Sequence, residues 1–244
     1  SDPALLPGVL WLPGRTLHPD YVGDAADTGR HTVPKYRDRV SSPGLMISPK
    51  SAGLELTFSK GEKSSYDGYV RALHAFLTPY NDSLQASNVQ CPQGHYFEQE
   101  GEEKKQSCQF NRSSLGPCSG LEGNEFFGYN EGSPCVIVKM NRIIGLKPLG
   151  NPKINCTSRQ VENVSLQYYP EYGKIDLMYF PYYGKKTHLQ YVQPLVAVKI
   201  TPSNSTGSSE IVLECKLHGS PNLKNEDERD KFLGRVNFRV QIRD

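Results

Sequence analysis

The side chains of this sequence that could do chemistry begin with six cysteines. They lie at Cys91, Cys108, Cys118, Cys135, Cys156 and Cys215. An even number of cysteines suits a set of disulfides, and six thiols allow fifteen pairings. The stretch CPQGH at 91–95 could donate two zinc ligands, but zinc sites pair cysteines at C-x-x-C spacing and the sequence has no such pair. Disulfides are therefore favoured over a metal site.

Five asparagines stand in the acceptor pattern Asn-x-Ser/Thr for N-glycosylation. They are Asn81, Asn111, Asn155, Asn163 and Asn204. Composition alone would give about one or two such patterns, so five indicate a glycosylated surface rather than coincidence. Glycans and paired thiols both indicate an oxidising compartment outside the cytoplasm.

The start of the chain shows no segment that could direct it there. Its longest apolar run is VLWL at 9–12, far short of the roughly 20 residues that a helix needs to cross a bilayer. We therefore expect either an ectodomain of a longer protein or a chain whose first segment differs from that of its relatives.

Patterns of the common enzyme and nucleic-acid-binding classes are absent. There is no G-x-S-x-G, no G-x-x-x-x-G-K-[ST], no G-x-G-x-x-G after a strand and no H-E-x-x-H, and the histidines are scattered. The acidic stretch NEDERD at 225–230 lacks the pattern of a calcium loop, so a solvated turn is favoured there. The 28 basic and 26 acidic residues are interleaved and give a net charge of +2, which leaves no electrostatic footprint for nucleic acid. We predict no catalytic residue, metal, cofactor or nucleic-acid partner.

The segment YFPYYGKKTH at 179–188 has a composition that a routine strand does not need. Four rings fall in five positions, so they would face both sides of a strand, and Pro181 cannot donate to a sheet. Tyrosine offers a large contact area with few rotatable bonds, and Gly184 would let another chain approach. We interpret the segment as a partner-contact patch; the alternative is that its rings line the core or cover a sheet edge.

The elements that must position these residues are mostly strands. The 22 Gly, 18 Pro and 14 Tyr, with only 36% hydrophobic residues, are typical of turn-rich β structure in one domain. We expect strands at 54–58, 135–140, 194–200, 210–217 and 235–242. Long gaps separate them, which favours an antiparallel sandwich over a parallel sheet.

One helix is expected, beginning at a Ser64 or Ser65 cap and ending before Pro79. Its apolar stripe, which should face a sheet, consists of Tyr66, Tyr69, Val70, Leu73, Phe76 and Leu77. Residues 1–31, rich in Pro, Gly and Asp, are expected to be poorly ordered, and 32–50 to form an extended connector. The β domain would then occupy 51–244.

Several blocks resemble one known family, the β subunits of the Na,K- and H,K-transporting P-type ATPases. The most specific is KQSCQFNRSSLGPCSG at 105–120, with two cysteines, a leucine and Ser-Gly at fixed offsets. Further similar blocks are VPKYRDRVSSPGLM at 33–46, GSPCVIVKMNRIIGLKP at 132–148, IDLMYFPYYGKKTHLQYVQPLVAVK at 175–199 and DERDKFLGRVNF at 227–238. The resemblance covers roughly residues 32–244, while 1–31 are unlike the family. Among the isoforms, the third Na,K-ATPase β subunit looks most similar, with the second as the alternate.

The resemblance implies a fold and a set of bonds. The fold would be mainly β, an immunoglobulin-like antiparallel β-sandwich with one packed α-helix and long disulfide-linked loops. The disulfides would join Cys91 with Cys108, Cys118 with Cys135 and Cys156 with Cys215.

The resemblance also implies a function. The chain would be a non-catalytic subunit that assists folding, plasma-membrane delivery and K⁺ affinity of the Na,K-ATPase α subunit, on the extracellular side and through an anchor not present in this chain. An FXYD-type regulatory subunit is a further expected partner. A cell-adhesion module is the alternative, and an H,K-ATPase β subunit a third reading. The residues expected to contact the α subunit are Tyr179, Phe180, Pro181, Tyr182, Tyr183, Gly184 and Lys185.

Overall fold

The structure is a computed structural model that describes residues 42–244 except 102, 160–163, 204–206, 224–228 and 231. Eight strands form two sheets of four. They are β1 (Leu45–Ser48), β2 (Glu55–Ser59), β3 (Cys135–Met140), β4 (Lys153–Ser158), β5 (Val164–Tyr169), β6 (Val196–Pro202), β7 (Ser209–His218) and β8 (Arg235–Arg243). The first sheet has the order β1-β3-β6-β5 and the second β2-β8-β7-β4.

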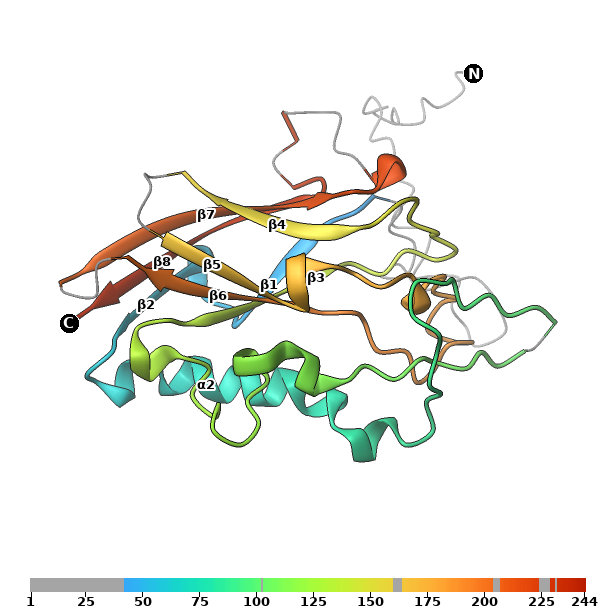
Figure 1. Cartoon of the computed structure of the whole chain (residues 1–244), viewed down its shortest axis with the longest axis horizontal. Helices are drawn as coiled ribbons and strands as arrows, with labels where there is room; N and C mark the ends of the chain where they lie inside the picture. The colour runs from blue at the N-terminus through green and yellow to red at the C-terminus, as the bar shows by residue number, and fades with distance from the viewer. Residues whose placement is uncertain (1–41, 102, 160–163, 204–206, 224–228, 231) are drawn as a thin grey trace, which may run out of the picture.

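The two sheets lie face to face as a sandwich, with helix α2 (Lys63–Leu77) against the first sheet on the side away from the second (Figure 1). The prediction of a mainly β sandwich with one packed helix is confirmed. Every strand pair is antiparallel except β2 and β8, which run parallel from Glu55 opposite Arg239 to Ser59 opposite Arg243. The sequence had predicted an antiparallel sandwich, and this one pair is the exception to that prediction.

Alternation along the strands decides which side chains form the core. In β8 the residues Val236, Phe238, Val240 and Ile242 are buried, whereas their neighbours are half-buried or exposed. Strand β3 is different, because Cys135, Val136, Ile137 and Val138 are all fully buried. A strand covered on both faces does not need to alternate, and β3 has the second sheet on one side and the helical layer on the other.

Helix α2 presents the apolar stripe that the sequence predicts, with Tyr66, Val70, Leu73 and Leu77 buried. Its predicted start is wrong, because the residue at the N-cap is Glu62, and no side chain caps the helix there. The hydroxyl of Ser65 instead donates to the Glu62 carbonyl oxygen at 2.6 Å and accepts from the Ser59 amide at 2.9 Å, which ties the helix to the end of β2.

Three strands were missed by sequence analysis. Strand β1 lies inside the stretch predicted to be a connector at 32–50, so the sandwich includes residues before 51. Strands β4 and β5 have exposed or half-buried residues at most positions and carry little apolar signal. Within the described ranges, no helix has both the length and the apolar character to cross a bilayer.

Three disulfides hold the sandwich and its long loops, and they join the cysteines in the order that the resemblance implied. Cys91 is bonded to Cys108, Cys118 to Cys135 and Cys156 to Cys215. The last bond links opposite residues of β4 and β7 inside the second sheet. The first closes the loop that packs on the aromatic segment described below.

Removing these bonds should destabilise the fold, and the loss should rise slowly with the length of the loop that each bond closes. Cys156 and Cys215 are 59 residues apart and Cys91 and Cys108 are 17 apart. We expect the variant with alanine at both Cys156 and Cys215 to lose roughly 4 kcal/mol of unfolding free energy, and the variant with alanine at both Cys91 and Cys108 roughly 3 kcal/mol. The reason is that a longer closed loop restricts the unfolded chain more. Guanidinium unfolding followed by circular dichroism measures both. A larger loss from the short loop than from the long one would contradict the expectation.

Candidate partner-contact segment

The aromatic segment joins β5 to β6 and starts from a short 3-10 turn, Leu177–Tyr179. Asp176 fixes its beginning, because one carboxylate oxygen accepts from the Met178 amide at 3.0 Å and from the Gly94 amide at 2.8 Å. A carboxylate at an N-cap satisfies amides that the turn leaves without partners. The segment is thereby tied to a loop more than 80 positions earlier in the chain.

Most of the residues predicted to contact a partner are buried inside this chain. Tyr182 is 1% exposed, Phe180 4% and Tyr179 8%. Pro181 and Gly184 are also buried, Tyr183 is half-buried and Lys185 is exposed. The alternative interpretation, that the rings line the interior, therefore describes Tyr179, Phe180 and Tyr182. Contact between the segment and a partner stays a prediction, and the accessible side chains that could make it begin at Tyr183.

Tyr182 is the centre of a buried ring cluster. Its ring centroid lies 4.6 Å from that of Tyr191 and 5.8 Å from that of His188, which it stacks on, and the Arg142 guanidinium lies 5.4 Å above it. Its carbonyl oxygen accepts from the Gly145 amide at 2.8 Å. Such ring pairs and cation-ring contacts stabilise beyond the area they bury. The cluster thus holds the loop after β3 against the segment.

The segment also holds the loop that carries the Cys91–Cys108 disulfide. The Phe97 amide donates to the Phe180 carbonyl oxygen and the Lys105 amide to that of Thr187, both at 2.8 Å. The Tyr183 hydroxyl accepts from the Gln99 amide at 2.7 Å. Three backbone amides of one loop are therefore satisfied by residues of the aromatic segment.

A tight turn follows, and it brings polar and apolar side chains to the surface. Gly184 has φ of +95°, a conformation that side-chain-bearing residues rarely adopt, and its carbonyl oxygen accepts from the His188 amide at 2.9 Å. Lys185, Lys186, Leu189 and Gln190 are exposed, Leu189 to 66%. Leu189 was not among the residues predicted to contact a partner. The feature that could have indicated it is a single leucine shortly after a Gly-Lys-Lys turn. We call Tyr183–Gln190 the exposed turn.

His188 is buried at the base of this turn as a neutral ring. Its Nε2 lies 2.8 Å from the Gln106 carbonyl oxygen and its Nδ1 accepts from the Tyr183 amide at 3.4 Å. This pairing assigns the proton to Nε2. Burial lowers the pKa of His188 below its ordinary value, and nearby Lys105 lowers it further, against the opposing bond to Gln106.

The predicted glycan acceptors differ in how accessible they are. Asn111 and Asn155 are exposed, Asn81 is half-buried, and Asn163 and Asn204 lie outside the described residues. The Asn111 carboxamide oxygen accepts from the amide and the hydroxyl of Ser113, at 2.9 and 2.6 Å. The Asn81 oxygen accepts from the Arg112 guanidinium. Asn111 and Asn155 offer the more open acceptor nitrogens.

The other sequence features have plain structural roles where they are described. Cys91 of the CPQGH stretch is in a disulfide, so this stretch is not a two-ligand metal site. Asp230 accepts from the Phe232 and Leu233 amides, as a turn residue does; residues 225–228 lie outside the described ranges. In the described part of the chain, no three His, Cys, Asp or Glu side chains gather where they could hold a metal ion.

Comparison with known proteins places these features in one family. The family model described as sodium / potassium ATPase beta chain matches residues 27–238. Human sodium/potassium-transporting ATPase subunit beta-2 is 45% identical over 223 residues, which are 87% of this chain and 76% of that protein. Protein ATP1B4 of Sus scrofa is 45% identical over 218 residues, 86% of this chain and 60% of that protein. The family recognised from the sequence is confirmed. The comparisons favour the beta-2 isoform, which was the alternate, and ATP1B4 over the third isoform that the sequence had favoured.

Removing the Tyr182 ring should destabilise the folded chain strongly. We expect Tyr182→Ala to lower the unfolding free energy by about 3–5 kcal/mol, as for other large buried rings, because a cavity replaces the cluster with Tyr191 and His188. Tyr172, which is 74% exposed, supplies the matched control, and Tyr172→Ala should change stability by less than about 0.5 kcal/mol. Guanidinium unfolding measures both. Equal effects of the two substitutions would show that the ring cluster does not stabilise the fold.

The unfolding free energy should fall as the pH is lowered, in part because His188 resists protonation in the folded chain. Its folded-state pKa is lowered, so below about pH 6.5 the unfolded chain binds a proton that the folded chain resists. The stabilisation is present above this range and is lost as pH falls through it. We expect His188→Gln to lose less stability than the parent between pH 7.5 and 5.5, measured as the change in denaturation midpoint. Parallel pH profiles for the two proteins would be inconsistent with this role.

Proposed function

We propose, from the premise that this chain belongs to the sodium/potassium ATPase β-chain family, that it acts as the non-catalytic β subunit of a sodium/potassium-transporting ATPase. The observation that carries the proposal is the family match across residues 27–238, which includes the sandwich and the aromatic segment. ATP chemistry would belong to the α subunit. The chain would assist the folding, plasma-membrane delivery and K⁺ affinity of that subunit.

The surface proposed to meet the α subunit is the exposed turn. The predicted contact set, Tyr179–Lys185, divides into two roles under this proposal. The buried rings of Tyr179, Phe180 and Tyr182 brace the segment from inside, and Tyr183 and Lys185 join Leu189 on the outside. One turn therefore carries a half-buried tyrosine, an exposed leucine and exposed lysines, and protein interfaces combine apolar and polar surface of this kind.

The setting of the subunit follows from the same premise. We place the domain on the extracellular side of the plasma membrane, because its three disulfides are stable in an oxidising compartment. Glycans on Asn111 and Asn155 would lie on open surface. An FXYD-type regulatory subunit remains a predicted further partner.

Capture by the α subunit tests the proposal. The full chain would be joined to the membrane anchor of the human beta-2 relative and co-expressed with a sodium/potassium ATPase α subunit. We expect Leu189→Asp to reduce co-purification roughly tenfold, since a charge at the centre of an interface commonly costs more than 1.4 kcal/mol. Leu149→Asp is the matched control, because Leu149 is 52% exposed and lies outside the turn.

The outcomes separate the alternatives. Full capture of both variants would remove the exposed turn from the interface. Failure of the parent chain to capture this α subunit would contradict the proposed function. Capture by an H,K-ATPase α subunit instead would favour that pump, and capture by neither would favour the adhesion alternative. Denaturation midpoints of all variants establish that each is folded.

A further inference from the structure

Strand β8 is longer than the strand that pairs with it on one side. Strand β7 pairs with β8 from Arg235 onward, but β2 pairs only with Arg239–Arg243. Among the described residues, the stretch 235–238 of β8 therefore has no paired strand on the side away from β7, between Gly234, whose amide donates to the Pro43 carbonyl oxygen, and Arg239, which pairs with β2. An unpaired strand edge is a template for a further strand.

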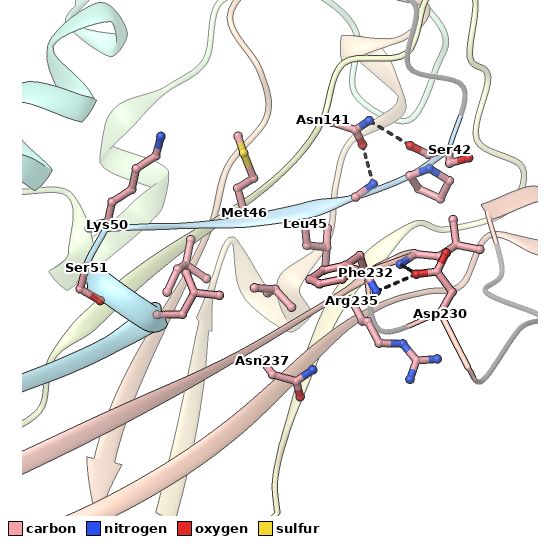
Figure 2. A pocket seen from close by; sticks show the side chains of 16 residues that line it. Ser42, Leu45, Met46, Lys50, Ser51, Asn141, Asp230, Phe232, Arg235 and Asn237 are labelled. Atoms are coloured by element: carbon pink, nitrogen blue, oxygen red, sulfur yellow. Dashed lines mark hydrogen bonds between the residues drawn. The ribbon is translucent and has the colours of Figure 1, made fainter. Parts of the chain in front are cut away.

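An apolar groove lies beside this stretch. Its volume is about 780 Å³, within the range of about 300–1,000 Å³ typical of ligand sites. Figure 2 shows it between β1, with Leu45 on the groove side, and the ribbon of β8. Ile47, Leu54 and Val236 add further apolar surface. The sandwich is thus open at the edge where β2 is too short to cover β8.

Exposed apolar side chains gather at this opening. Phe232 is 80% exposed, Met46 41% and Leu54 37%, and all three line the groove. Figure 2 places Phe232 close to Leu45, with Asp230 holding the adjoining turn. Contiguous exposed apolar surface of this kind commonly marks a binding site.

Residues that line the groove also carry buried polar atoms without hydrogen-bond partners. Among the described residues, five buried side-chain atoms lack a hydrogen-bond partner, and three belong to residues lining the groove: Ser51 Oγ, Arg235 Nε and Asn237 Oδ1. Unsatisfied buried polar atoms are rare in native proteins. The Arg235 and Asn237 side chains leave β8 on the face away from Leu45 (Figure 2), and Arg235 Nη1 lies 3.8 Å from Glu214 Oε1. An added strand would therefore pair with the backbone of this stretch rather than with these side chains. The groove therefore suits an extended peptide better than a wholly apolar small molecule.

The position of the N-terminal part of the chain points to the occupant. Ser42, Pro43 and Gly44, where the described chain begins, line the groove themselves. The Asn141 side chain fixes them, accepting from the Gly44 amide at 2.6 Å and donating to the Ser42 carbonyl oxygen at 2.9 Å (Figure 2). The 41 residues that precede Ser42 in the sequence therefore join the described chain at the edge of the groove.

The longest apolar run in those residues is Val9-Leu10-Trp11-Leu12, which stands between two Pro-Gly pairs. We propose that residues 9–12 of this same chain add as a short strand beside 235–238 of β8. Val9 and Trp11 would then face the groove together, because alternate residues of a strand share a face. Four residues have the length needed to span 235–238, and strand addition is an established mode of peptide recognition. The linker to Ser42 is long enough, and a tethered segment acts at high effective concentration.

Trp11 is the only tryptophan in the chain, so its fluorescence reports on the proposal directly. The full chain is excited beyond tyrosine absorption, and emission and iodide quenching are recorded before and after guanidinium unfolding. We expect native emission at shorter wavelength than that of the unfolded chain. In the variant Leu54→Arg/Phe232→Arg, emission should return to the unfolded value and quenching should rise several-fold. Leu149→Arg/Leu189→Arg, at exposed leucines outside the groove, should leave both unchanged.

Other results would overturn the inference. One is native emission equal to that of a synthetic peptide of residues 1–41, which needs no variant to fold. Another is a blue shift that the groove variant leaves intact. A blue shift that grows with protein concentration, with dimers in sedimentation equilibrium, would replace the same-chain occupant by a second copy. The measurement needs no α subunit, so its result is independent of the proposed function.

Discussion

Strand β3 is buried on both faces, and the three layers of the molecule depend on it. Val136, Ile137 and Val138 are 0% exposed because one side of the strand meets the second sheet and the other meets the helical layer. Burial of this run supplies apolar contact to both interfaces at once. Cys135 also ties its first residue to Cys118, so the layer of short helical turns cannot separate from the sheet. The loop after β3 then reaches the aromatic segment through Gly145.

The aromatic segment shows how a long connection can be rigid without being a strand. Its backbone and hydroxyl groups satisfy amides from residues 97–105 and 145, and its rings fill the space between those loops. The cost in conformational entropy of ordering such loops is large, and the buried rings and the Cys91–Cys108 disulfide offset it. The consequence for function is that the exposed turn stands on a fixed base. A partner would meet Leu189 and Lys185 in one arrangement, which lowers the entropy lost on binding.

The stretch 235–238 of β8 differs from the aromatic segment in how its backbone is covered. At the aromatic segment, backbone amides are satisfied by loops of the described chain. At β8, in contrast, the stretch 235–238 borders an apolar groove and pairs with no described strand on that side. Both arrangements follow from one constraint, that strand edges and apolar faces need cover. The first is met by residues distant in sequence, and we have proposed that the second is met by the N-terminal run.

The sequence by itself determined the class of the fold and the family, and the family resemblance supplied the disulfide pairing that the structure confirms. Strands β3, β6, β7 and β8 follow from β-branched runs and α2 from its apolar stripe, since these patterns are local and strong. Strands β1, β4 and β5 are short or mostly exposed, so their pairing depends on neighbours that local pattern does not reveal. The tertiary structure alone decided that Tyr179, Phe180 and Tyr182 face inward, that β2 runs parallel to β8, and that β2, within the described residues, pairs with only part of β8. Each of these depends on contacts between residues far apart in the chain. The type and spacing of the aromatic residues do not show whether a distant loop will cover them, so burial could not be predicted from the local sequence.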